Sequence, residues 1–147
     1  MPPGRVWLIA GGAASAVAAA AHLMCIAGGA DWFRFFGAGE EMARAVERGS
    51  VVSGLLTAAI AGVLALWAAY ALAGAGLIRP LPLLRWGLGA ITAVYLLRGL
   101  VIVAPAALAR PDLSASFLFW SSLIVLAIGI VHAVGLTLAW PSLAGVR

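Results

Sequence analysis

Lysine is absent from this chain and carboxylates are scarce, since nine arginines and five acidic residues supply all of the side-chain charge. The single cysteine, Cys25, excludes an intrachain disulfide and leaves too few thiolates for a structural zinc site. The arginines are scattered, so the chain lacks the basic stripe that phosphate backbones require. These absences exclude a disulfide-stabilised domain and a thiolate zinc module, and we expect no nucleic-acid partner.

Apolar residues are what the chain has in abundance. They make up 65% of its 147 residues, and the mean hydropathy is +1.12. A soluble domain of this length cannot hide so much apolar surface from water. Arginine in place of lysine, together with much alanine and glycine, is typical of a high-GC bacterial genome. The composition therefore predicts an integral protein of a bacterial inner membrane.

Four apolar stretches are each close to the roughly 20 residues that a membrane-spanning helix needs. They cover residues 6–28, 51–76, 84–106 and 116–140. The first runs longer than the apolar region of a signal peptide, so we interpret it as a retained helix. Pro80 and Pro82 separate the second stretch from the third, and a short turn at 110–114 follows the third. Short turns place neighbouring helices antiparallel. The predicted fold is an all-α membrane protein, an antiparallel four-transmembrane-helix bundle forming one domain over 1–147.

The one long hydrophilic connection covers residues 30–50. Its aromatic run at 32–36 is typical of headgroup level, and glycines at 37 and 39 break the chain. Residues 39–48 predict a short amphipathic surface helix supported by Glu40–Arg44 and Glu41–Arg44 pairs. Gly49 suits the position after that helix, and Ser50 suits the N-cap of the next. Apart from Arg98, four arginines fall on each side of the membrane, whereas all the acidic residues fall on the side of this connection. We therefore expect both termini to be cytoplasmic.

Helical periodicity gathers small and polar residues on one face of each stretch. These predicted inward faces are Gly11, Ser15, Ala19 and His22; Ser53, Thr57, Ala61 and Leu64; Gly87, Ile91, Val94, Tyr95 and Arg98; and Ser121, Val125, Gly129 and His132, with Ser122 beside them. Small residues allow helices to approach closely in lipid, so these faces are expected to pack together.

Arg98 is the strongest candidate for a site, because it lies roughly 10 Å inside its predicted helix. A charge at that depth costs a few kcal/mol and usually faces a partner, a cavity or an ion path. His22, Ser121 and Ser122 lie at a similar depth. Glu40 or Glu41 would be the partner if the surface helix folds over the bundle, and Asp31 and Asp112 are weaker candidates. The alternative is that Arg98 reaches the headgroups and has only a structural role.

The two histidines, His22 and His132, are expected to make interhelical hydrogen bonds. Paired histidines can also ligate haem b, but these two differ in depth by roughly 15 Å. Copper held by His22 and Cys25 is a further alternative, although Met24 points elsewhere on the helix. Ser121 and Ser122 are more typical of bonding to their own helix carbonyls than of a nucleophile. We therefore expect no cofactor.

The leading functional hypothesis is the binding or handling of a small amphipathic or anionic ligand, a lipid or a small solute, in a polar pocket in the outer half of the bilayer. Its candidate residues are Arg98, His22, Glu40, Glu41, Tyr95, Ser121, Ser122 and His132. One alternative is a membrane-embedded enzyme that uses glutamate and histidine for proton transfer on a lipid or isoprenoid. Another is a structural subunit whose small-residue faces dock partner helices or a second copy of the chain.

Overall fold

The computed structural model describes residues 3–103 and 115–144, and that part of the chain is helical with no strand. Its elements are α1 (Arg5–Gly28), α2 (Ala30–Phe35), α3 (Glu40–Glu47), α4 (Val51–Gly74), α5 (Leu84–Gly99), the 3-10 helix η1 (Leu100–Val103) and α7 (Ala115–Leu143). The prediction of an all-helical protein is confirmed. Residues 104–106 of the third predicted stretch and the predicted turn at 110–114 lie outside the described residues.

Three of these helices, α1, α4 and α7, are long and apolar enough to cross a membrane. They agree with the predicted stretches 6–28, 51–76 and 116–140 to within a few residues. In the third predicted stretch the α-helix is shorter than expected. Helix α5 ends at Gly99 after 16 residues, and the 3-10 helix η1 follows it. Glycine and the β-branched run at 101–103 have low helix propensity, which explains the change there.

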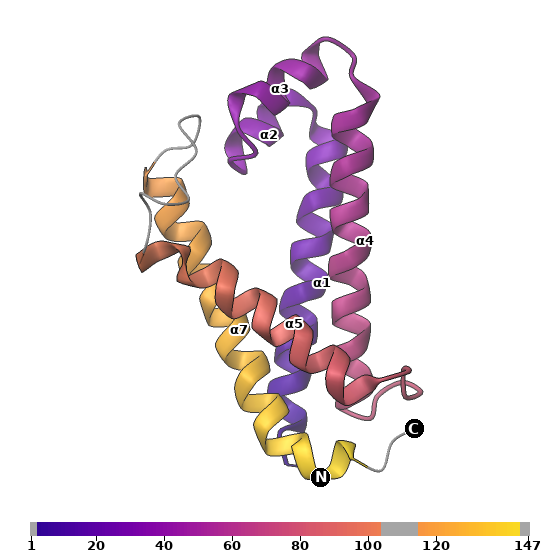
Figure 1. The fold of residues 1–147 in the computed structure, drawn as a ribbon. Helices are drawn as coiled ribbons and strands as arrows, with labels where there is room; N and C mark the ends of the chain where they lie inside the picture. The colour runs from indigo at the N-terminus through magenta and orange to yellow at the C-terminus, as the bar shows by residue number, and fades with distance from the viewer. Residues whose placement is uncertain (1–2, 104–114, 145–147) are drawn as a thin grey trace.

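The three long helices and α5 pack as two pairs, α1 along α4 and α5 along α7 (Figure 1). The pairs meet at the end formed by the start of α1, the α4–α5 connection and the end of α7, which we call the α4–α5 end. They diverge toward α2 and α3 (Figure 1). Glycine permits the close contact within one pair: a Cβ at Gly99 would lie 2.6 Å from the Leu126 Cα. The predicted convergence of four faces is therefore found in only part of the bundle.

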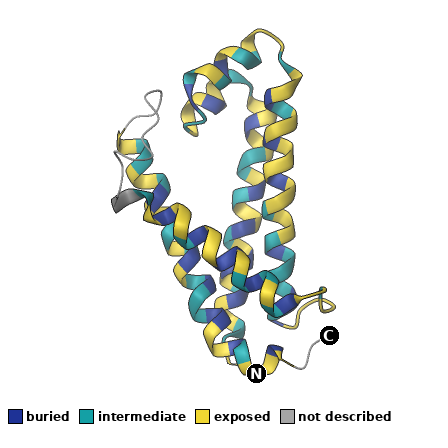
Figure 2. Ribbon diagram, viewed as in Figure 1, coloured by how far each residue is buried: buried dark blue, intermediate teal, exposed yellow. Residues whose placement is uncertain are grey.

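The main apolar core lies where the two pairs meet (Figure 2). Leu8 of α1, Leu88 of α5 and Leu136 of α7 pack there, with alanines of α4 between them. Most of the predicted inward faces are buried, among them Ser15, Ser53, Thr57, Ala61, Ile91, Tyr95, Ser122, Gly129 and His132. Val94 and Arg98 are exposed, so the neighbouring helices cover the predicted face of α5 only in part.

Helices α2 and α3 form a cap with its own small core of Cys25, Phe33 and Ala43. The predicted surface helix is present as α3, and Gly49 follows it with a φ of +77°, a left-handed conformation that favours glycine. Ser50 occupies the N-cap position of α4 but makes no capping hydrogen bond through its side chain. Helix α2 was not predicted, because six residues after two glycines give no periodic signal.

Candidate functional site

Arg98 lies at the last turn of α5, and its guanidinium reaches α7. Its Nη1 donates to the Ser122 Oγ at 3.1 Å, and its Nη2 approaches the Ser121 Oγ at 3.4 Å. Ser122 is fully buried, whereas Arg98 is exposed. These three residues, predicted to share a depth, are in contact in the structure. No carboxylate of the described residues forms an ion pair with Arg98, so within the described part of the chain two neutral hydroxyls are the partners of this cation.

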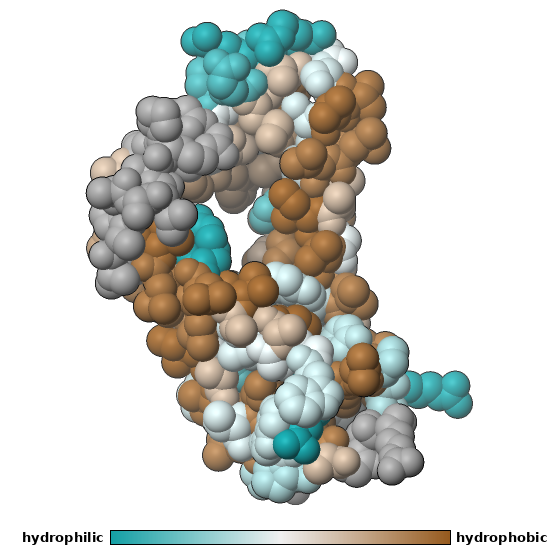
Figure 3. All heavy atoms as spheres, in the orientation of Figure 1, coloured by the Kyte–Doolittle hydropathy of each residue, from teal (hydrophilic) through white to brown (hydrophobic). Residues whose placement is uncertain are grey.

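The divergence of the helix pairs leaves an opening beneath the cap, and Figure 3 shows hydrophilic surface inside it. The walls around this hydrophilic surface are largely apolar, and the cap above is hydrophilic (Figure 3). The cap reaches α7 through Gly37, where an added Cβ would overlap the ring of Phe117. The described elements that flank the opening are the two helix pairs and the cap.

Tyr95 lies one turn before Arg98 and belongs to a buried junction between the helices. Its hydroxyl and the Ser15 hydroxyl of α1 share a hydrogen bond of 2.8 Å. Its ring packs against Trp67 of α4, with centroids 4.9 Å apart, and against His132 of α7, with centroids 5.1 Å apart. One residue from each long helix therefore meets at this point, which lies between the apolar core and the opening.

His132 is held in that junction by α1. A Cβ at Gly11 would lie 2.7 Å from the His132 Cε1, so only glycine admits the imidazole here. The His132 Nδ1 donates to the Ile128 carbonyl at 2.9 Å, because a carbonyl can only accept. In the neutral ring Nε2 is then an acceptor, and it is buried without a hydrogen-bond partner among the described residues. His132 therefore joins α1 to α7 through packing.

His22 is placed differently, since it is only half-buried on α1. Its Nδ1 donates to the Ala18 carbonyl at 2.8 Å within the same helix. The neutral ring therefore keeps Nε2 as the nitrogen that can accept a bond from a ligand. Among the described residues neither histidine makes the expected interhelical hydrogen bond, because each Nδ1 bonds to the carbonyl four residues earlier.

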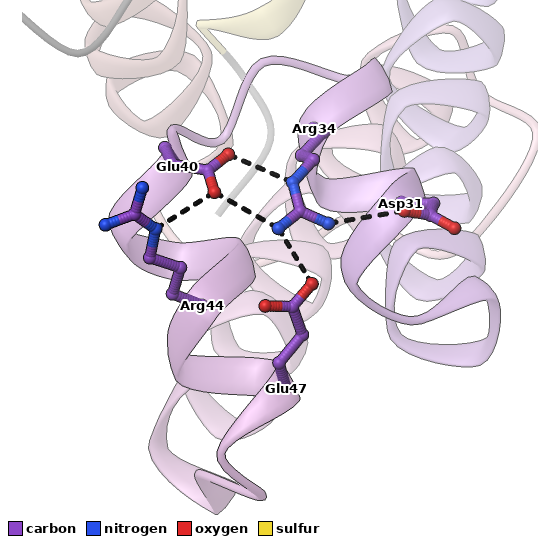
Figure 4. Close-up of polar contacts among 5 residues, drawn as sticks. All are labelled: Asp31, Arg34, Glu40, Arg44 and Glu47. Carbon is purple, nitrogen blue, oxygen red and sulfur yellow. Dashed lines mark hydrogen bonds and ion pairs between the residues drawn. The ribbon is translucent and has the colours of Figure 1, made fainter.

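The glutamates are not brought to Arg98. Glu40 bonds to Arg34 of α2 at 2.9 Å and to Arg44 at 3.1 Å (Figure 4), which confirms the predicted Glu40–Arg44 pair. Glu41 is exposed, and the predicted Glu41–Arg44 pair is not found among the ion pairs of the described residues. The hydrogen bonds from Arg34 and Arg44 lower the pKa of Glu40 to about 2. Such a carboxylate is a weak base, poorly suited to proton abstraction near neutral pH.

Arg34 is the centre of the cap's polar network, a role that sequence periodicity did not reveal. It contacts Asp31 at 3.3 Å, Glu40 at 2.9 Å and Glu47 at 2.7 Å (Figure 4). Its hydrogen bonds to the two glutamates raise its own pKa above the ordinary value. The network ties α2 to α3, so these glutamates stabilise the cap.

The described residues contain no group of three or more His, Cys, Asp and Glu side chains that could hold a metal ion. The two histidines are also separated along the bundle, because His132 packs on Gly11, eleven residues before His22. That spacing corresponds to about 16 Å along α1, which is too far for two axial ligands of one haem.

Comparison with protein-family models, with curated proteins and with solved structures gave no match for this chain.

Proposed function

We propose that the chain is a multi-pass protein of a bacterial inner membrane in which α5 and η1 together make a fourth crossing. Sixteen α-helical residues extend about 24 Å, and four 3-10 residues add about 8 Å. The sum is close to the hydrocarbon thickness of a bilayer, roughly 30 Å. In this arrangement the opening beneath the cap lies in the outer half of the membrane.

We place both termini on the cytoplasmic side. The described carboxylates all belong to the cap, at the opposite end from the start of α1. The cytoplasmic leaflet is rich in anionic lipid, so it favours the end that carries arginines without carboxylates.

The function we propose is the binding of a small anionic amphiphile, such as a lipid, between the two helix pairs. The observation that carries this proposal is Arg98, an exposed cation near the end of α5 that has serine hydroxyls of α7 as partners and no counter-charge among the described residues. A charge near the bilayer centre costs about 3 kcal/mol, and an anionic headgroup would offset that cost. The apolar walls of the opening would hold the hydrocarbon chain.

Ser121 and Ser122 would orient the guanidinium, since they fix it from one side and leave its remaining N–H groups for the ligand. His22 Nε2 would accept a hydrogen bond from a hydroxyl or a protonated headgroup. Glu40 and Glu41 would act through the cap and would not contact the ligand, because the cap network holds Glu40 on Arg34 and Arg44. This assignment favours binding over acid–base catalysis.

The test compares two probes that share a hydrocarbon chain, oleate and oleyl alcohol, in calorimetric titrations of the full chain in detergent. We expect the protein to prefer oleate. Arg98→Leu should weaken oleate binding at least tenfold, because a hydrogen bond to a charged group contributes about 1.5–3 kcal/mol. Oleyl alcohol binding should be unchanged.

Arg48→Leu is the matched control, since it removes an exposed arginine at the end of α3. It should leave both affinities unchanged. An Arg98→Leu protein that folds and binds oleate as the parent does would refute the proposed function.

A further inference from the structure

The arginines at the two ends of the bundle differ in their partners. Arg34 and Arg44 of the cap form ion pairs with carboxylates. The α4–α5 end carries Arg5, Arg79 and Arg85, and no described carboxylate lies in the elements that form it. This end therefore presents positive charge that nothing in the described chain neutralises.

Arg85 packs against two tryptophan rings of the described chain. Its guanidinium carbon lies 3.8 Å from the centroid of the Trp140 ring and 5.5 Å from that of Trp86. The two tryptophan rings meet edge to face, with centroids 6.0 Å apart. The face of an aromatic ring attracts a cation, but it does not provide full hydrogen-bond acceptors for the N–H groups of a guanidinium. The Arg85 Nε is buried without a hydrogen-bond partner among the described residues.

The aromatic setting indicates where this cation lies in the membrane. Trp86 is 66% exposed and Trp7 is 45% exposed at the same end of the bundle. Tryptophan concentrates at the level of lipid headgroups, with its ring partly in the hydrocarbon. A guanidinium stacked on such a ring lies at the depth of the lipid phosphates, and its planar N–H groups match phosphate oxygens.

We propose that Arg85, held against Trp140 and beside Trp86, binds the headgroup of an anionic phospholipid at the α4–α5 end. This proposal assumes that the long helices cross the membrane. It does not depend on a ligand at Arg98. The phosphate of the bound lipid accepts hydrogen bonds from the terminal N–H groups of Arg85, because the buried Nε lies out of its reach, and the lipid holds this end of the bundle in the anionic leaflet.

The experiment titrates the full-length detergent-solubilised protein with phosphatidylglycerol and with phosphatidylcholine, and native mass spectrometry counts the bound lipid. Arg85→Gln should weaken phosphatidylglycerol binding about fivefold, which equals the roughly 1 kcal/mol expected for one arginine near an anionic surface. Trp140→Leu keeps the charge but removes its platform, so it should give a smaller loss. Phosphatidylcholine binding should not change in either variant.

Arg48→Gln is the control, because it makes the same change of charge at the cap end, and it should bind phosphatidylglycerol as the parent does. If Arg85→Gln fails to fold, Arg85→Lys is used in its place. It keeps the charge but lacks the planar set of N–H donors, so it should still weaken phosphatidylglycerol binding. The titrations are repeated in an Arg98→Leu background, so that loss of the Arg98 ligand and loss of the Arg85 lipid are separated.

Equal phosphatidylglycerol binding by the parent and by a folded Arg85 variant would overturn the proposal. An equal fall for both lipids would also overturn it, since the effect would then not depend on headgroup charge. Inorganic phosphate forms a third arm. If phosphate displaces the lipid from the parent protein, the site recognises a free oxyanion and the proposal of a lipid site fails.

Discussion

Replacing Gly11 by alanine tests the junction that joins the two helix pairs. The new Cβ would lie 2.7 Å from the Cε1 and 2.8 Å from the Nδ1 of His132. Carbon atoms in contact prefer about 3.5–4.0 Å, so α1 and α7 would have to separate by roughly 1 Å. The His132 ring cannot move away freely, because it is fully buried, bonded to Ile128 and packed on Tyr95.

The cost follows from two opposing effects. Overpacking a close contact costs about 1–3 kcal/mol, and alanine regains up to about 1 kcal/mol over glycine within a helix. We expect Gly11→Ala to lower the free energy of unfolding by about 1–2 kcal/mol. The assay is equilibrium unfolding in mixed micelles of a mild detergent and dodecyl sulfate, followed by circular dichroism.

Gly62→Ala is the matched control, since a Cβ at Gly62 of α4 meets no atom within 4 Å. It should be neutral or slightly stabilising. The double variant Gly11→Ala, His132→Ala should lose less than the sum of the two single losses, because removing the imidazole makes room for the methyl group. If Gly11→Ala proved as stable as Gly62→Ala, the packing of His132 on α1 would be wrong.

Three further predictions concern the junction and the cap. Tyr95→Phe removes the buried hydrogen bond to Ser15, so it should lower the free energy of unfolding by about 1 kcal/mol in the same assay. Ser15→Ala should lower it by a similar amount, and the double variant should lose no more than either single variant, because both remove the same bond. Arg34→Gln leaves its three carboxylate partners without their common cation and should loosen the cap. Limited proteolysis should therefore cut the cap faster in this variant than in the control Arg48→Gln. Equal rates of cutting in the two variants would count against the network. The pKa of Glu40 is lower in the folded protein than its ordinary value of 4.5. The Glu40 carboxylate therefore stabilises the fold fully at a pH above 4.5, and this stabilisation is lost only as the pH falls toward about 2. An NMR titration of the Glu40 carboxyl carbon should show that midpoint, and a midpoint near 4.5 would contradict the ion pairs.

Sequence periodicity predicted the long helices and most of their inward faces. It succeeded because small and polar residues repeat at helical spacing in an apolar chain, which leaves few other arrangements. The rise per residue also placed Arg98 correctly at the level of Ser121 and Ser122.

What the sequence could not predict depends on contacts between elements. The meeting of Tyr95, His132 and Ser15 requires the crossing angle of the helix pairs, which no periodicity within one helix specifies. The same holds for Arg34, whose partner Glu47 lies 13 residues away on another helix. Among the described residues Arg98 forms no ion pair with Glu40 or Glu41, and Glu40 forms one with Arg34. The sequence pattern did not indicate this competing partner.

The most direct test of the account is the native mass of the protein as it is isolated from the membrane. We predict that the parent chain carries an anionic amphiphile, that Arg98→Leu loses it, and that Arg48→Leu retains it. A parent protein without such an adduct, or an adduct that remains on Arg98→Leu, would contradict the claim that Arg98 anchors a ligand between the helix pairs.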